Sequence, residues 1–399
     1  MPQRIIKKHA HNLPVDLVKY LFFLAPYVRC LKRIRLRFWI LEGEEKGSGK
    51  PLSILCGAND KPTRNYIAGL AFREGYRERS IGKTWSWDMN RIIDRSGHNC
   101  DLVFVNTCKG NRMFIKNGSW IFIPYWVEGV VDLPLGPEIL KSSTVRSDIR
   151  RIRNNGLVYE VTRDEKLFDD FYWNMHIPHV TTAHEKTFLL HAFEIKRRLF
   201  KRCELLLVKK EDRHIAGMEI GYYRKCPDLI VLGILDGDKL YVREGAMGAT
   251  YLYSLQYLGE KGCDKCGMGL SKAFLRDGVL LYKRKWGQRL VNTHPEQFGL
   301  KVLKDNEGAR AFLANNPFIF EHEGGLDGAV FVDTEQQLSP ESLDRIFQDY
   351  FHPGLSKLVV YTPGTVCEQT DVVPAELSDR IVLRKAEEVL CCNKPASRS

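Results

Sequence analysis

The sequence predicts a mixed α/β fold, and three observations support this class. The chain has 399 residues, of which 44% are hydrophobic and 27% charged, the composition of a globular protein. Short strand-like runs, such as Leu52–Cys56 and the alternating Leu157–Thr162, are separated by segments with helical spacing. The apolar stretch Leu17–Val28 contains Lys19 and Pro26 and is too short to span a bilayer. The length suffices for two or three domains that each bury a core.

The chain is basic, with a formal net charge of +11 and a sequence pI of about 9.0. Such a balance favours anionic partners: nucleic acid, acidic lipid headgroups or a phosphate-bearing cofactor. Basic residues are dense in Arg29–Arg37 and in Arg146–Arg153. With Leu17–Val28 beside the first of these runs, the N-terminal segment could make peripheral contact with an anionic membrane, or pack as a helix on the main body.

The eleven cysteines are irregularly spaced and odd in number, which argues against a disulfide framework. We therefore expect mostly reduced thiols and a cytoplasmic protein, with the inner face of the membrane as the alternative location. Cys263 and Cys266 form a lone C-x-x-C pair, which we interpret as two small buried residues.

Four segments follow from composition and pattern. Residues 1–50 form a basic amphipathic segment that ends in the polar linker Glu42–Lys50, and residues 51–134 form an N-terminal α/β lobe. Residues 135–300 form the central α/β domain, and residues 301–399 a C-terminal α/β extension. We expect Pro124–Pro134 to be a connection between the lobe and the central domain.

The central domain is predicted to begin with a basic helix, Pro137–Asn155, that Gly156 ends. After Leu157–Thr162 and two further helices, three strands are expected in sequence. They are Cys203–Lys210, Gly217–Tyr223 and Leu229–Leu235. A helix over Gly245–Glu260 and a strand over Cys263–Leu270 complete the pattern.

The segment Tyr241–Tyr251 (YVREGAMGATY) has the composition of a phosphate site. We expect a strand to end near Arg243 and a helix to begin among small residues, where backbone N–H groups and the positive helix end can approach an anion. The residues concerned are Arg243, Gly245, Ala246, Met247, Gly248 and Ala249. The alternative is a helix start that packs tightly on a sheet.

Four stretches together resemble one family. They are KSSTVRSDIRRIRNNGL (141–157), FYWNMHIPHVTTAH (171–184), LLLVKKEDRHIAG (205–217) and DGVLLYKRKWG (277–287). With the order of elements, they resemble the GNAT superfamily, and within it the FemAB-like acyltransferases, over about Pro124–Gln288.

This resemblance implies a GNAT-like core in which the acyl donor lies where the central strands splay apart. Its phosphate loop follows Arg/Gln-x-x-Gly-x-Gly/Ala, and Arg243-x-x-Ala246-x-Gly248 departs from it at the first glycine. Acyl-CoA, in particular acetyl-CoA, is the first donor that the resemblance implies. The alternative is aminoacyl-tRNA, the donor of FemAB enzymes proper. Residues 51–134 could be a second, degenerate GNAT-like lobe.

The candidate catalytic residues are Lys283 and Glu219. Lys283 matches the lysine of the family's closing signature, where a cation would steady negative charge that develops during acyl transfer. Glu219, on a predicted strand, is a candidate general base. Asp277 and Trp286 belong to the same closing signature and are candidate substrate contacts, although Asp277-Gly278 also has the composition of a turn.

The remaining candidate substrate contacts are basic or imidazole side chains. Arg146 and Arg150 share a face of the predicted basic helix, which could hold a substrate phosphate or a tRNA backbone, or could simply be solvated. His184 lies at the end of the second resembling stretch and could contact substrate. Its neighbours His176, His179 and His191 have no standard zinc spacing, so we expect no metal.

The sequence therefore predicts an N-acyltransferase that moves an acyl group from acyl-CoA to an amine of a small polar or sugar-linked acceptor. Aminoacyl transfer from tRNA is the second hypothesis. A non-catalytic GNAT-like scaffold at a membrane surface is the third.

Overall fold

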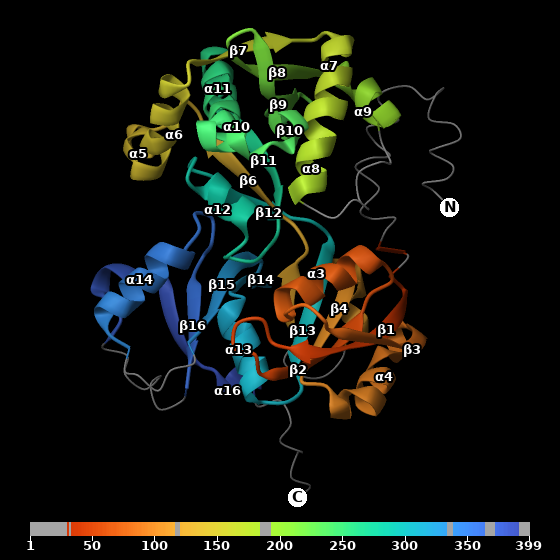
Figure 1. Ribbon diagram of the computed structural model, residues 1–399. Helices are drawn as coiled ribbons and strands as arrows, with labels where there is room; N and C mark the ends of the chain where they lie inside the picture. Colours follow the sequence, from red (N-terminus) through yellow and green to blue (C-terminus); the bar gives the residue numbers. More distant parts are fainter. Residues whose placement is uncertain are drawn as a thin grey trace, which may run out of the picture. The chain divides into compact units, whose positions relative to one another are not determined.

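A computed structural model describes residues 30–31, 33–115, 120–183, 193–332, 338–363 and 372–390. These residues form three β-sheets flanked by helices (Figure 1). The chain divides into two compact units, one built from residues 128–270 and 282–291, and the other from the remaining described residues. The mixed α/β class expected from the sequence is confirmed. Among the described helices, none combines the length and the hydrophobicity that a bilayer crossing requires.

The first unit contains a seven-stranded sheet. Its strands, in order across the sheet, are β12 (Arg289–Thr293), β6 (Val127–Asp132), β11 (Lys265–Ser271), β10 (Asp228–Ile234), β9 (Arg213–Gly221), β8 (Cys203–Lys210) and β7 (Leu157–Thr162). Its helical elements are α5 (Pro137–Lys141), α6 (Ser143–Asn154), α7 (Glu165–Phe171), the π-helical turn η5 (Tyr172–His176), α8 (Ile177–Ala183), α9 (Phe193–Phe200), α10 (Lys239–Glu244) and α11 (Ala246–Glu260). The short helix α12 (Gly278–Arg284) follows β11.

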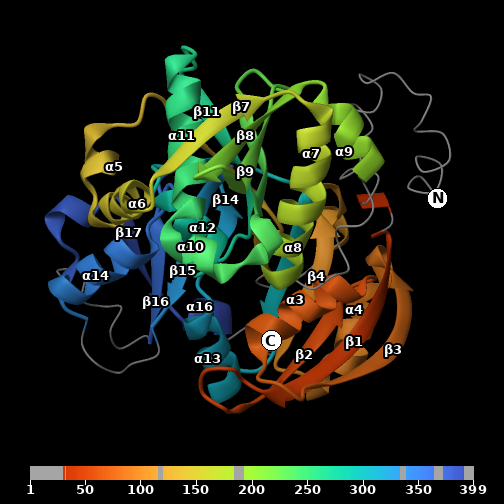
Figure 2. The ribbon, with the colours of Figure 1, turned by 45° about the horizontal axis from the view of Figure 1, so that its top comes forward.

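Helices cover both faces of this sheet (Figure 2). Successive strand residues point to opposite faces, so Leu206 and Val208 of β8 pack with α11, whereas Leu205 and Leu207 pack with α7 and η5. Both faces are therefore buried, which explains the nearly continuous apolar run of this strand.

The strand pairing of this unit matches the order implied by the resemblance. Strands β7, β8, β9 and β10 pair antiparallel in sequence; the chain then crosses through α11 and returns as β11, parallel to β10. A single residue pair, Asp228↔Gly267, joins β10 and β11 in the described chain, so the two strands separate beyond it. This splayed parallel pair after a run of antiparallel strands is a GNAT-like core.

The second unit contains two sheets. The strands of the six-stranded sheet, in order across it, are β3 (Arg77–Trp85), β1 (Arg35–Glu44), β2 (Pro51–Gly57), β4 (Leu102–Cys108), β13 (Glu296–Val302) and β5 (Ile121–Pro124). The four-stranded sheet of the C-terminal extension consists of β14 (Phe318–His322), β15 (Gly325–Phe331), β16 (Leu358–Thr362) and β17 (Ile381–Lys385). The helices of this unit are α3 (Lys61–Ala71), α4 (Met89–Ser96), α13 (Glu307–Asn315), α14 (Pro340–Tyr350) and α16 (Glu387–Leu390), with the turns η2 (Ser86–Asp88) and η4 (Lys109–Phe114).

The six-stranded sheet also contains a parallel pair of strands. Strand β2 is antiparallel to β1 and parallel to β4, and α3 follows β2 in the chain. Asp60 caps α3 by accepting a hydrogen bond from the amide of Thr63, and a proline occupies the first turn. Between α3 and β4 the chain also forms β3 and α4, so the second, degenerate GNAT-like lobe over residues 51–134 stays a prediction.

Several sequence predictions of local structure are wrong. The expected linker Glu42–Lys50 begins inside β1, and the expected connection Pro124–Pro134 contains β6. The basic helix Pro137–Asn155 is divided at Ser142, which accepts a hydrogen bond from the amide of Val145 and so begins α6. Strand β3, which was not expected, is mostly exposed and polar, so it lacks the apolar alternation on which strand prediction depends.

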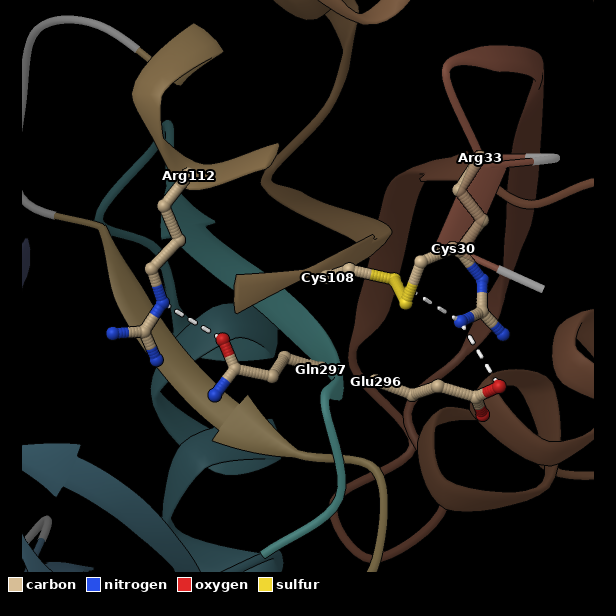
Figure 3. The surroundings of a disulfide bond; sticks show 6 residues. All are labelled: Cys30, Arg33, Cys108, Arg112, Glu296 and Gln297. Carbon is tan, nitrogen blue, oxygen red and sulfur yellow. Dashed lines mark hydrogen bonds and ion pairs between the residues drawn. A yellow bond between two sulfur atoms is a disulfide. The ribbon is translucent and has the colours of Figure 1, made fainter. Parts of the chain in front are cut away.

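One disulfide, between Cys30 and Cys108, ties the first described residues to the end of β4 (Figure 3). Beside it, Arg33 forms an ion pair of 3.2 Å with Glu296, and both side chains are largely buried. Six other described cysteines are free: Cys56, Cys100, Cys203, Cys226, Cys263 and Cys266. The expectation of mostly reduced thiols therefore holds for these six and is wrong for the pair.

Removing this disulfide is expected to destabilise the protein. The cystine joins residues 78 apart in the sequence, so its loss enlarges the conformational freedom of the unfolded chain. We expect Cys108→Ser to lower the free energy of unfolding by about 2–4 kcal/mol in urea denaturation. Cys226→Ser, at a free and partly exposed cysteine, is the control with little effect. Equal stability of Cys108→Ser and the unreduced parent chain would contradict a stabilising role.

Candidate active site

The candidate site lies where β10 and β11 separate. Lys283, from α12, is only 5% exposed, and its ammonium donates a hydrogen bond of 2.7 Å to the carbonyl oxygen of Leu270 on β11. Lys283 therefore places a positive charge beside β11, at a point beyond its pairing with β10. Lys283 belongs to the run Lys283-Arg284-Lys285, whose side chains would ordinarily be solvated, but Lys283 itself is buried.

Gly269 lets β11 pass close to the backbone of β10. Its φ of +65° is in the left-handed region that glycine adopts without strain. A Cβ at this position would lie 3.0 Å from the carbonyl oxygen of Leu229 on β10 and 3.9 Å from Nζ of Lys283. The lysine amine and the backbones of β10 and β11 therefore lie close together at Gly269.

His176, which the sequence analysis considered only as part of a histidine cluster, lies against β10. Its Nδ1 is 3.1 Å from the carbonyl oxygen of Leu232, which can only accept, so Nδ1 carries the proton and Nε2 is the basic nitrogen. Burial is the main cause that lowers the pKa of His176 to about 4, so the ring is neutral at pH 7. The structure thus presents an unprotonated imidazole nitrogen next to the splayed strand.

Glu219, the expected general base, is enclosed on β9. It is 1% exposed, accepts a hydrogen bond of 3.1 Å from the thiol of Cys203 and lies 3.6 Å from the ammonium of Lys196. Charged strand residues usually face solvent, but Glu219 does not. Burial raises the pKa of the Cys203 thiol, and the neighbouring Glu219 carboxylate raises it further, so the thiol stays protonated and acts as a donor.

The start of α11 differs from the predicted phosphate site in two respects. Arg243 ends the short helix α10 and not a strand, so that prediction is wrong; its side chain is exposed. Gly245, with φ of +105°, then turns the chain into α11. The following residues of the predicted loop are Ala246, Met247, Gly248 and Ala249, and of these only Met247 is not fully buried.

Helix α6 covers this start of α11. A Cβ on Gly245 would lie 3.0 Å from Cβ of Arg151, and a Cβ on Gly248 would lie 2.9 Å from Oδ2 of Asp148. The Asp148 carboxylate, which pairs with Lys285 at 2.5 Å, therefore occupies the neighbourhood of the helix end where a phosphate would have to bind. The hydrogen bonds that Asp148 accepts come from Tyr282 and Lys285, so the carboxylate restricts the space beside α11 without capping its amides.

The basic face of α6 is exposed. Arg146 and Arg150 point away from the buried residues Val145 and Ile152 of the same helix and are both accessible to solvent. They and Arg243 could contact an extended polyanion without entering a cleft.

The other predicted substrate contacts have different surroundings. Trp286 is fully buried in the core of its unit, so it supports the site and presents no surface to a substrate. Asp277 accepts a hydrogen bond of 2.9 Å from the amide of Leu280, the geometry of the turn that its sequence favoured. His184 lies outside the described residues. Among the described residues, no group of His, Cys, Asp or Glu could hold a metal ion.

Glu204 on β8 forms a polar network that the sequence analysis missed because its members come from distant segments. Its carboxylate accepts hydrogen bonds from Arg163, Tyr222, Tyr257 and Lys261 at 2.5–3.1 Å. Burial alone would raise the pKa of Glu204, but these hydrogen bonds outweigh it and hold the pKa at about 2.

Acidification is expected to weaken this network. The pKa of Glu204 is lowered from an ordinary 4.5, so its contribution to stability is complete above pH 4.5 and is lost as the pH falls towards 2. We expect Glu204→Gln to lose about 1–2 kcal/mol at pH 7, a value reduced for the exposure of Arg163, and much less at pH 3. Urea unfolding at both pH values measures the difference; an equal loss at both would contradict the role of the charge.

Lys272, directly after β11, is a second feature that the sequence did not reveal. Its ammonium lies over the rings of Tyr66, Tyr125 and Trp126, at 4.4, 3.4 and 3.6 Å from their centroids. No described residue forms a hydrogen bond or ion pair with it. Burial, partly offset by nearby carboxylates, lowers the pKa of Lys272 to about 7, so part of this amine is unprotonated at neutral pH.

Comparisons with known proteins are limited to structure. No family model matches this sequence, and no curated protein does. FemX is 11% identical over an alignment that includes 65% of this chain and 83% of the FemX chain, and its TM-score is 0.35. L-PGS from Bacillus licheniformis is 13% identical over 70% of this chain and 88% of the L-PGS chain, and its TM-score is 0.34. A GCN5-related N-acetyltransferase from Sphaerobacter thermophilus is 11% identical over 65% of this chain and 79% of the acetyltransferase chain, and its TM-score is 0.30.

All three TM-scores are below 0.5. The first unit is GNAT-like because of its own strand order and its splayed β10–β11 pair.

Proposed function

We propose that this protein is an N-acyltransferase whose donor carbonyl lies between β10 and β11. The observation that supports this most directly is the single residue pair between these parallel strands, with the buried ammonium of Lys283 beside the opening. Backbone N–H groups of β10 that face β11 beyond this pair can donate to the carbonyl oxygen of an acyl donor. The ammonium of Lys283 would then stabilise the negative charge that develops on that oxygen.

The acceptor in this proposal is an amine of a small polar or sugar-linked molecule. Its nitrogen attacks the carbonyl carbon, the bond to the leaving oxygen or sulfur breaks, and the amine proton leaves to a base. Our candidate for this base is Nε2 of His176, although the burial that lowers its pKa to about 4 makes it a weak base. Glu219 is enclosed by Cys203 and Lys196 and is the more deeply buried of the two.

The covered start of α11 favours an aminoacyl-tRNA over acyl-CoA as the donor. The Asp148 carboxylate lies 2.9 Å from the Cβ position of Gly248, so it narrows the approach of a pyrophosphate to the start of α11. A tRNA would instead contact the exposed arginines Arg146 and Arg150 through its backbone, and would bring an ester to the splayed strands.

Two binding measurements separate the donors. We expect retention of charged tRNA on a filter, weakened by added salt, and no detectable heat on titration with acetyl-CoA. Heat with acetyl-CoA and no tRNA retention would reverse the choice of donor. If neither donor binds or is discharged in the presence of a panel of small amines and amino sugars, the protein is the non-catalytic scaffold of the third hypothesis.

A further inference from the structure

We propose that one face of β1 and β3 docks on the surface of an anionic phospholipid bilayer. This surface lies in the second unit and is independent of the N-terminal segment that the sequence analysis considered. It combines a pocket of unneutralised cations with an adjacent ridge of exposed aromatic side chains.

The cationic part is a hollow of about 340 Å³ lined by Arg35, Arg37, Asn59 and Lys83. Arg35 and Arg37 are two residues apart on β1, so they point to the same face, and Arg37 lies directly opposite Lys83 of β3. Like charges directly opposite each other in a sheet are destabilising. Among the described residues, no carboxylate pairs with any of these three cations, so an anion from outside would relieve their repulsion.

Asn59 fixes the geometry of this hollow. Its side-chain oxygen accepts from the amide of Arg37 at 2.9 Å, and its side-chain nitrogen donates to the carbonyl oxygen of Arg35 at 2.8 Å. The side-chain amide of Asn59 therefore fixes the backbone at both arginines. Their guanidinium groups lie over tryptophan rings, Arg35 at 5.4 Å from the centroid of Trp85 and Arg37 at 5.8 Å from that of Trp39. Arginine guanidinium groups match the oxygens of a phosphate.

The apolar part begins at the same strand pair. Trp85, opposite Arg35 in the register, is 44% exposed, and Trp87 is 52% exposed. The two rings stack at 4.9 Å, Phe114 meets Trp87 edge-on at 5.9 Å, and the neighbouring Met113 is 70% exposed. Exposed large apolar side chains beside basic residues mark an interaction surface.

The arrangement favours a bilayer over a nucleic acid. The tryptophan rings cover one face of each other, so no base can enter between them. Tryptophan is favoured at the membrane interface, and each cation near an anionic leaflet adds about 1 kcal/mol. Asp88 is the acidic residue next to Trp87 and is outnumbered by the three cations.

The test is flotation of the full chain with vesicles of phosphatidylcholine containing about 30% phosphatidylglycerol, compared with phosphatidylcholine alone. We expect binding to the anionic vesicles only. Arg35→Gln with Lys83→Gln should weaken the partition about tenfold or more, since two cations each contribute about fivefold. Trp85→Ser with Trp87→Ser should weaken it about tenfold and remove quenching of tryptophan fluorescence by brominated lipid.

Two matched variants control for general charge and hydrophobicity. Lys239→Gln removes an exposed cation, and Trp173→Ser removes a tryptophan that is 46% exposed, both in the first unit. Both should float as the parent chain does, and all variants should retain its melting temperature.

Three results would overturn the proposal. The first is equal flotation of the parent chain with neutral and anionic vesicles, or none with either. The second is unchanged flotation of both double variants. The third is loss of binding to single-stranded RNA by the double variants while vesicle binding persists, which would assign the surface to nucleic acid.

Discussion

Replacement of Lys283 by methionine is expected to lower the rate of acyl transfer by a factor of about 10² to 10³. Loss of one group that stabilises developing oxyanion charge has this effect when the site excludes water, and Lys283 is only 5% exposed. Methionine preserves most of the side-chain length and leaves the carbonyl oxygen of Leu270 without this donor. The measurement is single-turnover discharge of the acyl donor with saturating amine acceptor.

The design of this experiment separates catalysis from stability. Lys285→Met is the matched control, because Lys285 belongs to the same charge run but pairs with Asp148 instead of lying at the splayed strands. We expect the Lys285 variant to keep its turnover rate to within a fewfold. A Lys283→Met variant that folds with an unchanged melting temperature and retains full turnover would remove Lys283 from the mechanism.

The sequence was informative where one segment alone determines a structure. Leu157–Thr162 and Cys203–Lys210 have the bounds that were predicted, because their apolar patterns reflect their own burial. Ser339 caps α14 by a local interaction of the same kind, since a cap depends on residues within one turn. Two strands were not predicted. Strand β3 is largely exposed to solvent, and strand β6 is short and flanked by prolines.

The site was predictable only in its residue types. Lys283 was identified from a resembling motif, but its burial depends on α12 and β11 together. The approach of Asp148 to Gly248 joins two helices whose packing no local pattern encodes. The same holds for the three rings around Lys272, which come from residues 66, 125 and 126. The sequence therefore predicts which residue types take part, but it does not predict which distant segments lie next to one another.

Trp286→Ala is expected to destabilise the protein by about 3–5 kcal/mol. The indole is fully buried in the main core of its unit and stacks with Tyr251 at a centroid distance of 6.2 Å and an angle of 9°. Truncation removes the transfer free energy of a large side chain and leaves a cavity that the surrounding strands cannot fill. Urea unfolding of the parent chain and the variant measures the loss.

The same variant tests the two interpretations of the closing signature. If Trp286 contacted a substrate, its loss would raise KM with little change in the free energy of unfolding, whereas a core residue has the opposite effect. Trp173→Ala is the matched control, because this tryptophan is 46% exposed and should cost less than about 1 kcal/mol. Because Trp286 lies two residues beyond the end of α12, which holds Lys283, we also expect Trp286→Phe to retain most of the stability and most of the turnover rate. A Trp286→Ala variant as stable as the parent chain would show that the buried indole does not hold this part of the core together.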